Sequence, residues 1–224
     1  MLSVLSFLET RVLGVLLEKE RTVPDTYPLT LNTLIAGCNQ KTSRDPIASA
    51  SEVEVQAALD SLKRMNLVIE SSGGRVPRYT HNFERVIQVP RQSSAILTVL
   101  MLRGPQTAGE LRINCERLHA FSDISSVEGF LNELAERPAG ALVAELPRQA
   151  GSRENRWAHC LSGAPAVAQA PVAADPGPAA AAPEAYGYSV SELAAVKASV
   201  ARLEAEVTQL KALVSRMAGE LGIS

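Results

Sequence analysis

Two short stretches, Leu67-Val68-Ile69-Glu70 and Arg78-Tyr79-Thr80-His81, recur further along the chain as Leu142-Val143-Ala144-Glu145 and Arg156-Trp157-Ala158-His159. In both copies the first stretch is apolar and typical of a strand, and a polar segment containing glycine separates it from the second. Such a segment allows the chain to turn and the two stretches to pair antiparallel. The repeat therefore predicts two β-hairpins, each with a polar tip.

Matching residues also precede the two hairpins, in the same order along the chain. At offsets that change only slowly, the following sets correspond: Leu59 and Leu62 with Leu131 and Leu134; Thr30, Leu34 and Cys38 with Thr107, Leu111 and Cys115; Leu13, Val15 and Leu16 with Leu97, Val99 and Leu100. Each half is thus predicted to hold three helices followed by a hairpin, which is the element order of a winged helix-turn-helix.

We therefore predict a mainly α-helical protein with small β-hairpins (α+β), divided into four parts. Residues 1–90 and 91–162 are the two tandem winged helix-turn-helix domains, residues 163–188 are an Ala/Pro-rich linker that we expect to be disordered, and residues 189–224 are a coiled-coil helix. Only 4% of the residues are aromatic, so Leu, Val and Ile must form most of the two small cores.

Apolar periodicity and capping residues set the expected boundaries. In the first half we predict a helix over residues 3–19, a helix capped by Thr30, a helix over 52–65 with Ser51 and Glu54 as a capping box, and strands over 67–70 and 78–82. In the second half we predict a helix capped by Ser93 or Ser94, a helix capped by Thr107, a helix over 125–136, and strands over 142–146 and 155–161.

Composition limits the classes of function. The net charge of −2 and the isoelectric point near 6.0 exclude a protein that coats nucleic acid by charge alone. The three cysteines have no CxxC spacing and are expected to be buried apolar residues in a reducing compartment. Glu9 and Arg11 interrupt the apolar start, and no uncharged stretch is long enough for a membrane span. We predict a cytoplasmic protein.

The sequence offers no arrangement of reactive groups for an enzyme. It has no GxSxG, GxxxxGK[ST], GxGxxG or HExxH motif. His81 and His159 fall at equivalent positions of the repeat, which favours a structural role for both. His159 and Cys160 could supply two metal ligands, but no second pair lies at ligand spacing. We predict neither catalysis nor a cofactor or metal.

Local basic clusters indicate double-stranded DNA as a partner. In a winged helix the third helix enters the major groove while the hairpin tip contacts the backbone or minor groove. Both tips are polar and basic, and so is the segment between the second and third helices of the first half. The predicted phosphate contacts are Lys41, Arg44, Arg75, Arg78, Arg148 and Arg153, and the possible base-reading residues are Asn39 and Gln40.

The third helices argue against DNA. The first exposes Glu52, Glu54 and Asp60 against Lys63 and Arg64, and the second carries more carboxylates than basic residues. Several carboxylates facing phosphates reduce affinity. A protein-interaction adaptor built on the same modules is therefore the alternative to a transcriptional regulator, because fold does not fix function.

A strict heptad repeat begins after residue 189. β-branched residues at one core position with Leu at the other favour a parallel two-stranded coil, hence a homodimer. The alternative is an amphipathic helix packed on the protein's own globular part. The predicted dimerisation residues are Leu193, Val196, Val200, Leu203, Val207, Leu210, Val214 and Met217.

Two segments carry a family resemblance. Glu-Thr-Arg-Val-Leu-Gly-Val-Leu-Leu-Glu-Lys at residues 9–19 and Tyr-Pro-Leu-Thr-Leu-Asn…Cys-Asn-Gln-Lys-Thr-Ser-Arg-Asp-Pro at residues 27–46 resemble the YceH family of bacterial proteins. The similarity extends over about residues 5–162 and includes the unusual run at 39–46. It implies tandem winged-helix domains in a bacterial cytoplasmic protein and assigns no catalytic or binding residue.

Overall fold

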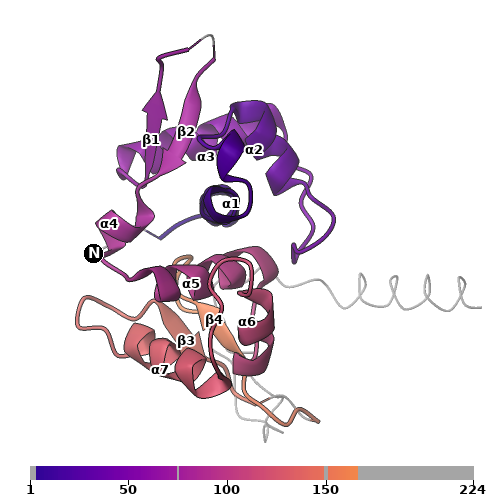
Figure 1. Ribbon diagram of the computed structural model, residues 1–224, viewed down its shortest axis with the longest axis vertical. Coiled ribbons are helices and arrows are strands. Elements are labelled where there is room, and N and C mark those ends of the chain that lie inside the picture. The colour runs from indigo at the N-terminus through magenta and orange to yellow at the C-terminus, as the bar shows by residue number, and fades with distance from the viewer. Residues whose placement is uncertain (1–3, 75, 149–150, 166–224) are drawn as a thin grey trace, which may run out of the picture. The chain divides into compact units, whose positions relative to one another are not determined.

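The computed structural model describes residues 4–74, 76–148 and 151–165, which all belong to one compact unit. The chain is mainly helical with two small antiparallel hairpins, as predicted (Figure 1). The predicted coiled coil with its dimerisation residues, nearly all of the predicted linker, and Arg75 lie outside the described residues.

Three helices precede the hairpin in each half. The first half consists of α1 (Phe7–Thr22), the 3-10 turn η1 (Pro24–Thr26), α2 (Leu31–Cys38), α3 (Glu52–Arg64), β1 (Val68–Ser71) and β2 (Arg78–His81). After the short α4 (Phe83–Ile87), the second half consists of α5 (Arg91–Arg103), α6 (Ala108–Asn114), α7 (Ile124–Ala135), β3 (Val143–Glu145) and β4 (Trp157–His159). The predicted element order is confirmed, with boundaries shifted by a few residues.

Most predicted helix starts are confirmed by their caps. Thr30, Ser51 and Thr107 each accept the backbone N–H three residues on, and the last two form complete capping boxes. The prediction that Ser93 or Ser94 caps a helix is wrong. α5 begins earlier, at Arg91, and both serines are buried inside it. Their small side chains fit there because α5 packs against α1, α6, α7 and β4.

Each hairpin gains a third, single-residue strand that periodicity cannot reveal. Leu29 exchanges two backbone hydrogen bonds with Tyr79 of β2, at 3.0 and 2.8 Å. Gln106 does the same with Trp157 of β4, at 3.0 and 2.7 Å. In both halves this pairing fixes the segment before the second helix to the return strand of the hairpin, so the repeat extends to a contact between distant parts of the sequence.

The two halves share one core along α1 and α5, which pack against each other (Figure 1). A Cβ atom added at Gly14 of α1 would lie 2.9 Å from Cδ2 of Leu102 of α5, so the missing side chain allows close approach of the helices. Val12, Leu13, Ile96 and Leu97 are fully buried. Neither helix belongs to the core of one half alone.

A pair of helical glycines tests this packing. A Cβ at Gly37 of α2 would lie 2.6 Å from Cγ1 of Val15, whose β-branched side chain has little rotamer freedom in a helix. Gly37→Ala should therefore lower the free energy of unfolding by about 1–3 kcal/mol. Gly129→Ala in α7, where the added atom meets nothing within 4 Å, should raise it by about 0.5–1 kcal/mol. Urea titrations of both variants measure this, and equal effects would contradict the packing.

Candidate nucleic-acid interface

Arg44 is buried rather than presented to solvent. Its side chain is 0% exposed, and Nη1 and Nη2 donate to the two carboxylate oxygens of Glu18 in α1 at 3.1 and 2.7 Å. Nε donates to the carbonyl oxygen of Gly37 at 3.1 Å. Every part of the guanidinium is thus used inside the protein, so the structure does not support the predicted phosphate contact of Arg44.

A second buried arginine, Arg11, bonds to the backbone at both ends of the loop that carries Arg44. Arg11 of α1 donates through Nη2 to the carbonyl oxygen of Pro46 at 2.7 Å and through Nη1 to that of Cys38 at 3.5 Å. Burial, together with the neighbouring charge of Arg44, lowers the pKa of Arg11. Sequence reasoning missed Arg11 and Glu18, because both lie in a helix recognised by its apolar residues.

The loop at residues 39–46, which we call the 39–46 loop, also fastens the first half to the second. The backbone N–H of Asp45 donates to the carbonyl oxygen of Leu102 at 2.9 Å. Arg103 donates through Nη2 to Oγ of Ser43 at 2.8 Å. These bonds reach the last turn of α5. The loop is therefore a structural connection between the halves, whatever else its exposed residues do.

The predicted base-reading side chains in this loop are also occupied. Asn39 donates to the carbonyl oxygen of Ala50 at 2.9 Å and accepts from its N–H at 2.7 Å. Gln40 donates to Thr42 and accepts from Lys19 at 3.4 Å. Lys41 is exposed. Among the predicted contacts in the loop, Lys41 is the one whose side chain has no partner among the described residues.

In the first hairpin, Arg78 has a structural partner. It donates to the carbonyl oxygen of Pro28 at 2.8 Å, and Arg156 donates to that of Pro105 at the same distance in the second half. Arg156 also forms an ion pair with Glu110 at 2.9 Å. In both halves this arginine thus holds the single-residue strand against the hairpin. This structural role explains why the arginine recurs in the repeat, and no contact with nucleic acid is needed to explain it.

The second hairpin presents two basic side chains without an ion pair among the described residues. Arg148 and Arg153 are exposed and line a groove of about 390 Å³ with Ile124 and Trp157. The remaining lining residues include three carboxylates, namely Glu128, Glu145 and Glu154. The groove is therefore of mixed charge.

The surface of α3 is acidic and apolar, in keeping with the predicted conflict. Glu52 and Glu54 are exposed on either side of Val53, which is 78% exposed. Lys63 is taken up by Asp60 at 2.8 Å and Glu70 at 2.6 Å, and these carboxylates raise the pKa of Lys63. A phosphate approaching the first turn of α3 would thus meet carboxylates and an aliphatic side chain.

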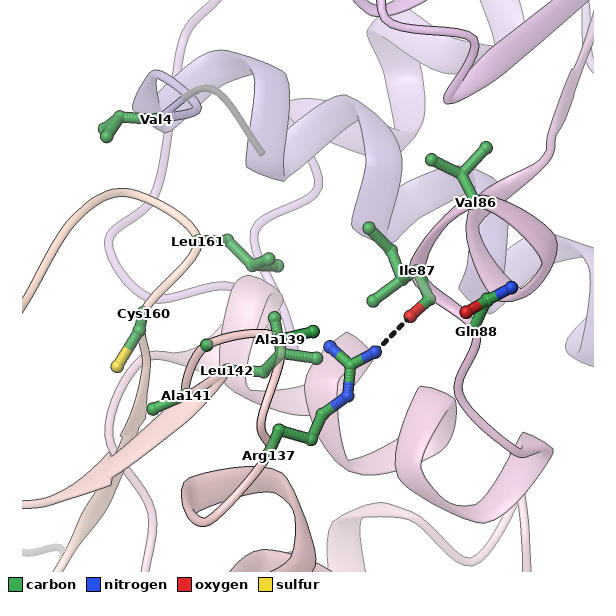
Figure 2. Close-up of a pocket in the computed structure, with 11 residues that line it drawn as sticks. Val4, Val86, Ile87, Gln88, Arg137, Ala139, Ala141, Leu142, Cys160 and Leu161 are labelled. Carbon is green, nitrogen blue, oxygen red and sulfur yellow. Dashed lines mark hydrogen bonds between the residues drawn. The ribbon is translucent and has the colours of Figure 1, made fainter. Parts of the chain in front are cut away.

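A further pocket of about 300 Å³ lies beside α4 and the segment after α7 (Figure 2). Arg137 reaches across it, and Nη2 donates to the carbonyl oxygen of Ile87 at 2.6 Å. Ile87 ends α4, so the guanidinium satisfies a carbonyl that the helix leaves unpaired. Cys160 lines the same pocket with its sulfur directed away from Arg137 (Figure 2). This arrangement joins α4 to the second half.

The two repeated histidines differ in surroundings. Nε2 of His81 lies 2.9 Å from a carboxylate oxygen of Glu20, and its Nδ1 accepts from the N–H of Phe83 at 3.4 Å. In His159, Nδ1 is buried without a hydrogen-bond partner among the residues that the structure describes, and burial lowers the pKa of the imidazole to about 4. Cys38 and Cys115 are buried as predicted, which raises their thiol pKa values to about 11 and about 12. Cys160, for which burial was also expected, is only partly buried.

The described helices include none that is long and apolar enough to cross a membrane, and residues 4–165, where described, hold no group of three or more His, Cys, Asp or Glu placed to bind a metal ion.

These observations define a mainly helical protein with two short hairpins and a loop that a buried arginine fixes in place. Residues 5–152 match the family described as "Protein of unknown function, DUF480". The chain is 60% identical over 210 residues to a UPF0502 protein of Dechloromonas aromatica, which covers 94% of both chains. It is 58% identical over 222 residues to a UPF0502 protein of Methylibium petroleiphilum, covering 99% of this chain and 92% of the relative. The chain belongs to this bacterial UPF0502/DUF480 family, which is YceH-like, as the 39–46 run indicated.

The burial of His159 predicts a pH dependence. In the unfolded chain a histidine titrates near pH 6.5, whereas the folded value is about 4. Between these limits the unfolded chain binds a proton that the folded protein does not, so stability falls as the pH is lowered from 6.5 to 4. His159→Gln should remove this pH dependence, which amounts to at most about 3 kcal/mol of unfolding free energy between pH 6.5 and pH 4. Urea unfolding at several pH values measures it, and an unchanged slope would contradict the burial of a neutral imidazole.

Proposed function

We propose that each half is a winged helix-turn-helix module and that the protein is a non-enzymatic adaptor that binds another protein through α3. The order of three helices and a hairpin supports the first part, as does the added strand residue at Leu29 and at Gln106. The second part rests on the side chains at the position where such modules present their reading helix.

The observation that carries the proposal is the first turn of α3. Val53 is 78% exposed between two exposed carboxylates, and Ile47 in the preceding segment is 63% exposed. Exposed aliphatic side chains are individually unremarkable, but here they accompany negative charge at a helix that would otherwise face phosphate. The complementary partner is a protein surface with Lys or Arg beside an apolar recess.

A specific observation supports DNA as a second candidate. Arg148 and Arg153 extend from the second hairpin without a carboxylate ion pair among the described residues, and Lys41 is exposed on the 39–46 loop. Three such cations give a smaller positive surface than the six basic residues predicted from the sequence. Dimerisation through residues 189–224 would double it and raise the effective concentration of each module.

Site-specific photo-crosslinking separates the two candidates. A photoreactive amino acid is placed at Val53 of α3, at Arg153 of the second hairpin, and at Ile113 of α6 as a control that is 69% exposed. Under irradiation in bacterial cells expressing the full chain, position 53 should give one discrete protein adduct that position 113 lacks. Nuclease-sensitive adducts at position 153 with none at position 53 would replace the adaptor by DNA binding.

A matched pair of substitutions measures how much α3 contributes to partner binding. Val53→Asp should reduce recovery of the crosslinked or captured partner by about tenfold, because apolar contacts at an interface centre dominate affinity. Ile113→Asp introduces the same charge on α6 and should leave recovery and thermal stability unchanged. Equal losses for both variants would show that α3 is not the binding surface.

A further inference from the structure

A small, partly open cavity of about 170 Å³ lies where the two halves meet at the 39–46 loop. One side is formed by the last turns of α1 and by the loop, and the other by the end of α5, by α6 and by the segment that follows it. Val99, Leu102 and Leu118 form its apolar part. Its polar side chains converge from both halves and include Lys19, Gln40, Ser43, Arg103, Asn114 and Arg117.

The cavity carries an excess of positive charge. Glu18 is the one carboxylate among its described lining residues, and Arg44 already neutralises it at 2.7 Å. Lys19 lies 3.2 Å from the same carboxylate, which thus serves two cations. Arg103 and Arg117 have no carboxylate ion pair among the described residues. Lys19, Arg103 and Arg117 therefore line a cavity whose one described carboxylate is shared between Lys19 and Arg44, and Arg44 does not line the cavity.

The hydrogen-bonding groups suit an oxyanion. Arg103 uses Nη2 on Oγ of Ser43, which fixes its guanidinium and leaves Nε and Nη1 without a partner among the described residues. A planar guanidinium fork held in this way matches phosphate oxygens, and the Lys19 ammonium adds a point charge. Asn114 is oriented by its bond to Oε1 of Gln106 at 2.7 Å. The mainly polar lining disfavours a ligand with a large apolar part.

We propose that this cavity binds a small phosphorylated molecule, with the phosphate group held by Lys19, Arg103 and Arg117. Its volume fits a phosphate with a short substituent and is too small for a nucleic-acid duplex. Because its walls belong to both halves, the bound anion would hold α1 and α5 together more firmly by binding the folded state alone. The site is separate from α3 and does not depend on the proposed partner.

Calorimetric titration of the full chain with inorganic phosphate and with pyrophosphate tests the site, with sodium chloride at matched ionic strength as the reference. We expect saturable binding with one site per chain. Arg117→Gln, which changes an exposed side chain, should weaken phosphate binding about tenfold, as should Lys19→Gln, because each removes a charge-assisted hydrogen bond. Arg85→Gln removes an exposed arginine of α4 that does not line the cavity and should leave the affinity unchanged.

Any of three results would overturn the proposal. The first is a heat of binding for phosphate no greater than that for sodium chloride, and the second is an equal loss of phosphate affinity in Arg117→Gln and Arg85→Gln. The third is displacement of phosphate by a short DNA duplex at a lower concentration than by pyrophosphate. The last result would assign these cations to a nucleic-acid surface. Crosslinking at Val53 reports on a different element, so failure of the adaptor proposal leaves these titrations unaffected.

Discussion

The buried ion pair between Arg44 and Glu18 is the constraint on which the arrangement of the first half depends. An arginine cannot shed its proton on burial, so its charge must be compensated where it lies. Burial by itself would raise the pKa of Glu18, but the hydrogen bonds and charge of Arg44, followed by those of Lys19, lower it overall, so the carboxylate stays ionised beside the guanidinium. The pair fixes the 39–46 loop on α1, and the bonds of Asp45 and Ser43 then reach α5.

The packing of α1 against α5 joins the two repeated halves. Two halves of this size could each bury a separate core, yet α1 and α5 are buried against each other, and the absence of a side chain at Gly14 allows their close approach. Arg137 adds a bond from the second half to the end of α4. The two halves thus share one core within a single compact unit instead of folding around two separate cores.

Local signals in the sequence predicted local structure well. The hairpins and the caps at Ser51 and Thr107 follow from residues within a few positions of one another. Whether an arginine is buried depends on distant residues, so Arg44 resembled the free Arg153 in sequence while the fold placed it against Glu18. For the same reason the repeat marked Arg78 and Arg156 as equivalent without showing that each holds a proline carbonyl. Ser93 and Ser94 were misassigned because burial by another half does not appear in helical periodicity.

Three residues of the run at 39–46 thus have structural partners: Arg44 pairs with Glu18, Asn39 bonds to the backbone of Ala50, and Ser43 accepts from Arg103. A double-mutant cycle of Glu18→Gln and Arg44→Met, followed by urea unfolding, tests this most directly. Removal of either partner should cost about 3–5 kcal/mol, because the remaining buried charge then loses its main partner, and the double variant should recover at least about 2 kcal/mol of the summed loss. Additive losses below about 1 kcal/mol each, the range of an exposed ion pair, would contradict the account.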